Sequence, residues 1–169
     1  MNKSYQKLLK NGHCIIKNVF DANYCEKLVK KIDKLYIDKR KRKKDIDEGT
    51  IFGQQIIRDL VLRDPKTFLR LIDNKKIIKI LNNLFKDSFI LENIMASNSL
   101  NVKNNYKRIV HIDSHLPTQD PKLTTDAVAM ICLDDFKKEN GATKIWPKSH
   151  LSGIKIHHEK NKLKNNKKK

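Results

Sequence analysis

The stretch Ile109-Val110-His111-Ile112-Asp113-Ser114 places a histidine and a carboxylate two residues apart on a predicted strand. Successive strand side chains alternate between the two faces, so residues i and i+2 point the same way, roughly 6.6 Å apart along the backbone. His111 and Asp113 can therefore reach one metal ion together. One histidine and one carboxylate are also two of the three ligands in the 2-His-1-carboxylate arrangement that holds non-haem Fe(II).

The third ligand of such a site is the open question. His115 lies on the same strand face, but in a regular strand it stands roughly 13 Å from His111, with the metal ion on the line between them. A bend near Leu116-Pro117 would make His115 a ligand; in a straight strand it is a rim or supporting histidine. His157-His158 is a second candidate pair, with exposed surface histidines as the alternative. Taken alone, His111-Ile112-Asp113 is also compatible with a capping or salt-bridged pair.

Length and composition limit the class of protein. A chain of 169 residues has room for one domain with a sizeable core. No run approaches 18 apolar residues, and the first residues lack the charged-then-apolar pattern of a signal peptide. Cys14, Cys25 and Cys132 are scattered without CxxC spacing, which indicates small core residues in a reducing compartment. We expect a cytoplasmic protein with no membrane segment.

The formal net charge of +18 raises the question of nucleic-acid binding, because Lys and Arg neutralise phosphates. Much of the excess lies in two runs, residues 39–44 and 160–169. Neither run is interleaved with the aromatic residues that would stack on bases. Solvated basic loops are the favoured interpretation, and a polyanion-binding site is the alternative.

Helical patterns dominate the first half of the chain. Residues 4–10 predict a short helix that is stopped by Asn11-Gly12. Three longer patterns each begin at a residue suited to an N-cap, and these residues are Asp21, Asp64 and Asn74. The first of these helices is expected to end in the basic run 39–44.

From Ser88 the apolar period changes from helical towards two, which predicts strands. Predicted strands cover residues 13–19, 88–100, 109–114, 127–133 and 143–146, with a turn at Asn140-Gly141. Helices followed by short strands predict an α+β domain that closes as a sandwich or jelly roll. Because a jelly roll needs about eight strands, we expect the domain 1–159 to be incomplete at its C-terminus. Residues 160–169 form a basic low-complexity tail.

Several motifs between His111 and His150 occur together. They are His111-Ile112-Asp113, Leu133-Asp134-Asp135-Phe136, Glu139-Asn140-Gly141-Ala142-Thr143 and Ile145-Trp146-Pro147-Lys148-Ser149-His150. With the N-terminal layout of helix, Asn-Gly turn, strand and helix, residues 5–153 resemble the phytanoyl-CoA dioxygenase family of Fe(II)/2-oxoglutarate oxygenases. Lys148 stands where that family usually has glycine.

The resemblance implies a double-stranded β-helix (jelly roll, cupin-like) in which His111 and Asp113 bind Fe(II). It also implies 2-oxoglutarate as co-substrate and hydroxylation of a small organic or lipid-like substrate. Asn140, Trp146 and Ser149-His150 would be structural parts of the turn and the wall. The family's third ligand, a later histidine, and the arginine that pairs with the far carboxylate of 2-oxoglutarate have no match. No arginine follows Arg108, and lysine is a poor substitute for a bidentate guanidinium.

The favoured hypothesis is therefore an oxygenase-like domain that lacks these two groups and would need a complementing C-terminal segment. Whether the chain as written is an active enzyme stays open. The alternatives are a non-catalytic binding protein that retains the fold, and a basic nucleic-acid-binding module. Fe(II) titration separates the first two, and the salt dependence of binding tests the third.

Overall fold

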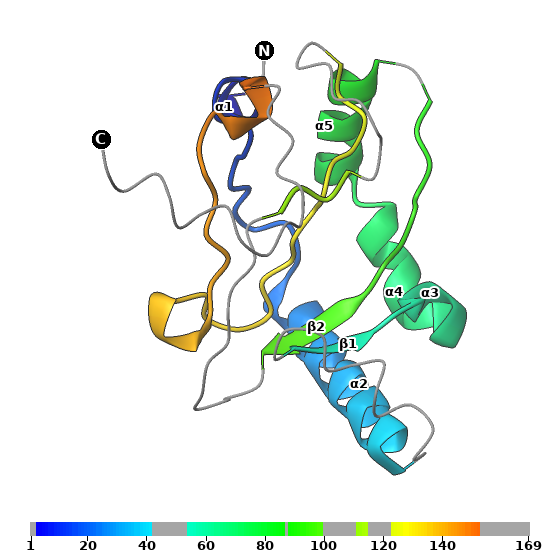
Figure 1. The fold of residues 1–169 in the computed structure, drawn as a ribbon. Coiled ribbons are helices and arrows are strands. Elements are labelled where there is room, and N and C mark those ends of the chain that lie inside the picture. Colours follow the sequence, from blue (N-terminus) through cyan, green and yellow to red (C-terminus); the bar gives the residue numbers. More distant parts are fainter. Residues whose placement is uncertain (1–2, 42–53, 87, 100–110, 115–122, 153–169) are drawn as a thin grey trace.

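The computed structural model describes residues 3–41, 54–86, 88–99, 111–114 and 123–152. Its elements in chain order are α1 (Lys3–Asn11), α2 (Ala22–Lys41), β1 (Gln54–Ile57), α3 (Leu60–Arg63), α4 (Pro65–Ile72), α5 (Lys75–Phe85), β2 (Ala96–Ser99) and the 3₁₀ turns η4 (Lys138–Asn140) and η5 (Ser149–Leu151). Figure 1 shows the small sheet beside α2, while the segment 123–152, in yellow to orange, ends next to α1. This mixture of helices with an antiparallel pair of strands is α+β, as predicted.

Three helices begin at the N-caps that the sequence predicts. In each, a side-chain oxygen accepts a hydrogen bond from a backbone N–H of the first turn, which has no acceptor inside the helix. The bonds run from Tyr24 to Asp21 (2.8 Å), from Thr67 to Asp64 (3.2 Å) and from Lys76 to Asn74 (3.0 Å). The helix α2 continues to Lys41, into the basic run. None of the helices described here has the length and apolar character needed to cross a bilayer.

The two-stranded sheet forms between distant parts of the chain. β1 pairs antiparallel with β2, from Gln54 opposite Ser99 to Ile57 opposite Ala96. The single O–H of Tyr36, on α2, is shared between the carbonyl oxygens of Gln55 at 2.8 Å and Ala96 at 3.2 Å. One phenol therefore connects α2 to both strands. β1 was not predicted, because only its partner in another part of the chain makes it a strand.

The core lies where α2, α3 and α4 meet the sheet. Its buried residues are Tyr24, Leu28, Tyr36, Ile57, Leu60, Phe68, Leu71 and Ala96. Phe68 has no exposed surface, so α4 is anchored at the centre of the cluster. Ile131 and Leu133 also pack against this cluster. The segment 123–152 therefore contacts the helical part of the chain, from α2 to α5.

Most of the predicted strands are not strands within the described residues. The structure assigns no strand to residues 13–19, 88–95, 111–114, 127–133 and 143–146. The predicted strand 88–100 is reduced to β2. Within the predicted strand 127–133, Val128 and Met130 are 66% and 56% exposed, respectively. A strand requires a hydrogen-bonded neighbour, and the described part of the chain supplies none for these segments. Residues 109–110 and 160–169 lie outside the described residues.

Candidate metal centre

His111 and Asp113 lie in the short described segment 111–114. The Nε2 atom of His111 is 3.3 Å from the Oδ1 atom of Asp113. Their side chains are 52% and 62% exposed, respectively. The two side chains thus turn to the same side and are accessible to a ligand from solvent, although the segment itself is not a strand.

The spacing of the two groups fits neighbouring ligands of one metal ion. Two such ligands, each about 2.1 Å from an ion and at right angles to one another, lie about 3.0 Å apart. The observed 3.3 Å between nitrogen and oxygen is close to this value. The same distance also fits an ion pair when the imidazole is protonated, and an exposed pair of this kind contributes little to stability. A neutral imidazole and a carboxylate are the donor types that Fe(II) accepts.

No third ligand joins this pair among the residues that the structure describes. Within them, no group of three or more His, Cys, Asp or Glu side chains is placed to hold a metal ion. Three of the histidines considered from the sequence, His115, His157 and His158, lie outside the described residues. His111 and Asp113 are therefore two of the donors that a complete site requires.

His150 has a different position, at the C-terminal end of α1. Its Nε2 atom is 3.0 Å from the carbonyl oxygen of Leu9, and the backbone N–H of Lys148 donates to the carbonyl oxygen of Asn11 at 2.9 Å. Gly12 has φ +77°, and a Cβ atom built there would lie 2.5 Å from Nδ1 of His150. Carbonyl groups at the end of a helix lack intrahelical donors, so Lys148 and His150 supply partners to α1. This contact supports the expectation that Ser149-His150 is structural.

The predicted turn at Asn140-Gly141 is present, around η4. The side-chain oxygen of Asn140 accepts a hydrogen bond from the backbone N–H of Lys137 at 2.8 Å, and its amide donates to the carbonyl oxygen of Asp135. Gly141 has φ +94°, a conformation that favours glycine. Trp146 is 55% exposed, so the described residues do not enclose it in a wall.

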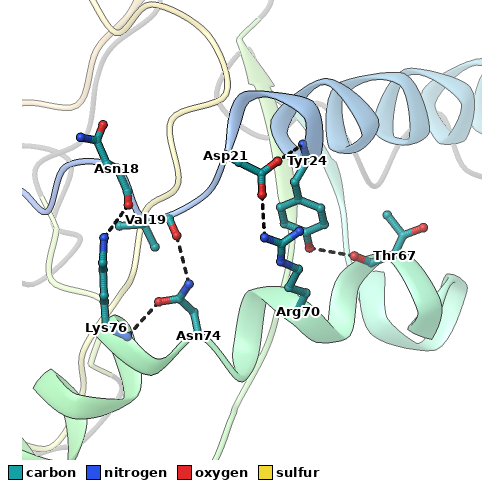
Figure 2. Close-up of polar contacts among 8 residues, drawn as sticks. All are labelled: Asn18, Val19, Asp21, Tyr24, Thr67, Arg70, Asn74 and Lys76. Atoms are coloured by element: carbon teal, nitrogen blue, oxygen red, sulfur yellow. Dashed lines mark hydrogen bonds and ion pairs between the residues drawn. The ribbon is translucent and has the colours of Figure 1, made fainter.

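A polar cluster that was not predicted from the sequence joins α2 to α4 (Figure 2). Arg70 donates to the carboxylate of Asp21 at 2.7 Å, and its guanidinium carbon lies 4.3 Å from the centre of the Tyr24 ring. The hydroxyl of Tyr24 donates to the carbonyl oxygen of Thr67 at 2.8 Å. The backbone N–H of Tyr24 and then Arg70 lower the pKa of Asp21 below its usual value. This cluster fixes two helices, and its signal in the sequence was the acidic N-cap alone.

Comparison with known proteins identifies a family. A protein-family model described as "Phytanoyl-CoA dioxygenase (PhyH)" matches residues 8–169, which is nearly the whole chain. The matched range includes His111 and Asp113 together with α2 to α5. No curated protein and no solved structure matches the chain.

Proposed function

This chain belongs to the phytanoyl-CoA dioxygenase family, and we propose that it is a non-haem Fe(II)/2-oxoglutarate-dependent oxygenase that hydroxylates a small organic or lipid-like substrate. The family suggests this class of oxygenase, and its enzymes generally use Fe(II) and 2-oxoglutarate. The observation that carries the proposal for this chain is the 3.3 Å approach of His111 to Asp113 within the matched range.

His111 and Asp113 are the proposed ligands of the iron. The imidazole supplies a nitrogen donor in its neutral form, and the carboxylate supplies an oxygen donor with a negative charge that offsets part of the charge of the ion. Bound Fe(II) supplies the oxidising chemistry in this class of enzyme. The task of the two side chains is to fix the position of the ion while other coordination positions stay open to the co-substrate.

We also propose that a β segment bearing a histidine and an arginine completes the site and the double-stranded β-helix. Support comes from the coordination positions of the metal ion that two side chains leave unfilled. It also comes from the absence of any arginine after Arg108 in the sequence. Lysine presents a point charge, whereas gripping a carboxylate in one orientation favours the planar guanidinium. Reading the DNA beyond the codon of Lys169 tests this: a His-and-Arg-bearing segment is expected, and its absence in every frame would contradict the proposal.

Anaerobic titration with Fe(II), followed by calorimetry, tests the ligand assignment. We expect one saturable iron site in the wild type. We expect its loss in His111→Ala and in Asp113→Ala, because either change leaves a single side-chain ligand for the ion. His13→Ala is the matched control, since His13 lies beside the C-terminal end of α1, where its Nδ1 atom is 3.3 Å from the carbonyl oxygen of Asn11. Iron binding that is unchanged in His111→Ala would refute the assignment. A chain that binds no iron would instead favour the non-catalytic binding protein.

A further inference from the structure

A surface cavity of about 420 Å³, open to solvent, lies between α1, the residues that follow it, and α5. Its lining residues are Ser4, Ile15, Ile16, Lys17, Lys76, Lys79 and Ile80. The lining combines three ammonium groups with three isoleucines and contains no carboxylate. It shares no residue with the His111 and Asp113 pair, so binding in this cavity does not require iron.

Hydrogen bonds between the surrounding elements hold the walls of this cavity in place. The hydroxyl of Tyr5, on α1, donates to the carbonyl oxygen of Asn83 on α5 at 2.9 Å. The side chain of Asn74 donates to the carbonyl oxygen of Val19 at 3.2 Å, and this contact is drawn in Figure 2. α1 and the segment that follows it are thus each tied to α5. A cavity formed in advance spares a ligand the cost of ordering it.

The charged side chains that line the cavity are all lysines. Lys76 and Lys79 are three residues apart on α5, which places them on the same helix face, and Lys17 comes from the facing segment. The first turn of α5 contains no acidic residue that would offset them. Like charges at this spacing repel one another, and an anion with more than one negative charge would replace that repulsion with attraction.

Lys76 has a second role that limits how it can be tested. Its ammonium group donates to the carbonyl oxygen of Asn18 at 2.6 Å, as Figure 2 shows. An ammonium group has three donors, so two remain for a ligand. Lys17 and Lys79 are exposed, and replacing them leaves the contact between Lys76 and Asn18 in place.

The isoleucines give the cavity an apolar side. Ile80 is buried in α5, whereas Ile15 is 81% exposed beside the lysines. A ligand with an apolar body would cover part of this exposed surface, at a gain of roughly 25 cal/mol per Å² of apolar area buried. The lining therefore combines cationic groups with exposed apolar surface.

We propose that this cavity binds a phosphate monoester with an apolar organic body. The phosphate carries close to two negative charges and three acceptor oxygens, which match the ammonium groups of Lys17, Lys76 and Lys79. The organic body lies on Ile15 and Ile16. This is a binding function separate from the proposed oxygenase site, and it is tested without iron.

Calorimetric titration of the full chain with phenyl phosphate, at constant ionic strength, tests the site. We expect one binding site whose affinity falls about tenfold in the double variant Lys17→Gln/Lys79→Gln, from the loss of two charge contacts. The control Lys66→Gln/Lys144→Gln removes the same two charges outside the cavity and is expected to bind like the wild type. Equal weakening in both double variants would show only general attraction to a basic chain and would overturn the proposal, as would the absence of binding by the wild type.

Two further ligands separate the contributions of the phosphate and of the apolar body. Inorganic phosphate is expected to bind more weakly than phenyl phosphate, and Ile15→Ser is expected to remove that difference while leaving inorganic phosphate unaffected. Benzoate, with one charge on a similar ring, is expected to bind more weakly than phenyl phosphate. Benzoate that binds as tightly as phenyl phosphate would overturn the assignment of a phosphate. Far-UV circular dichroism of each variant checks that the helices are intact.

Discussion

The part of the chain from α2 to α5 and the segment 123–152 differ in where their apolar side chains lie. The first part, together with Ala96 of β2, supplies the whole buried cluster around Phe68. In the segment 123–152 no residue is fully buried, and Phe136, Ile145 and Trp146 are each at least half exposed. Helices satisfy their backbone hydrogen bonds internally, whereas strands depend on a partner. Among the described residues, apolar side chains are therefore buried where the backbone forms helices or the β1–β2 pair. An apolar composition alone does not bury them.

The largest expected effect comes from truncating one aromatic residue in each region. Phe68→Ala is expected to lower the free energy of unfolding by about 4 kcal/mol, because it opens a cavity in a fully buried site. Phe136→Ala, the matched change at a half-exposed site, is expected to stay within about 0.5 kcal/mol. Urea denaturation followed by circular dichroism measures both.

A milder variant keeps this comparison measurable if Phe68→Ala does not fold. Phe68→Leu conserves most of the volume and is expected to cost less than about 1.5 kcal/mol. If Phe136→Ala proved as costly as Phe68→Ala, the segment 123–152 would be packed in solution, and the contrast between the two regions would fail.

The second effect concerns the contact that joins the segment 123–152 to α1. Gly12→Ala is expected to cost about 2 kcal/mol, because alanine is strained at φ +77° and its Cβ would lie 2.5 Å from Nδ1 of His150. In a His150→Ala background only the backbone strain remains, so the cost is expected to fall by about 1 kcal/mol. A double-mutant cycle on thermal unfolding measures the difference. If the losses of unfolding free energy in the two single variants simply add, His150 does not contact Gly12.

The smallest effect sharpens the description of the helical part through its pH dependence. Tyr36→Phe removes the donor for two carbonyl oxygens and is expected to cost about 1 to 2 kcal/mol near neutral pH. Burial raises the pKa of Tyr36 to about 12. The unfolded chain therefore releases this proton at a lower pH than the folded chain, and the wild type loses stability as pH rises above about 10.

The variant has no such proton, so the gap between wild type and Tyr36→Phe is expected to narrow by about 1.4 kcal/mol from about pH 8 to about pH 11. The effects of the many lysines cancel in this difference. Urea denaturation at the two pH values measures it, and a gap that does not change with pH would place the Tyr36 phenol in water.

The helical part could be predicted from the sequence because its determinants are local. Asp21, Asp64 and Asn74 each cap a helix through a backbone N–H two or three residues away. β1 and β2 are separated by α3 to α5 along the chain, and only their pairing turns Gln54–Ile57 into a strand. Among the residues that the structure describes, the strands expected in 127–133 and 143–146 are absent for the same reason, since an apolar pattern alone does not supply a neighbour.

The same distinction between local and long-range determinants applies to the candidate site. The approach of His111 to Asp113 follows from a spacing of two residues, and the structure brings the two atoms to 3.3 Å. The contact of His150 with Leu9 spans 141 positions, and neither residue type nor spacing pointed to it. The sequence likewise did not predict that three lysines line one cavity. Lys17 lies near Lys76 and Lys79 only because the segment after α1 is tied to α5.

The placement of the aromatic side chains gives each region its own optical signal. Tyr5, Tyr24 and Tyr36 each donate a hydroxyl hydrogen bond to the backbone of another element, whereas the single tryptophan, Trp146, is half exposed in the segment 123–152. Indole fluorescence therefore reports on that segment, and the near-ultraviolet dichroism of Tyr5, Tyr24 and Tyr36 reports on α1 and α2. A single unlabelled sample can follow both regions during one thermal scan.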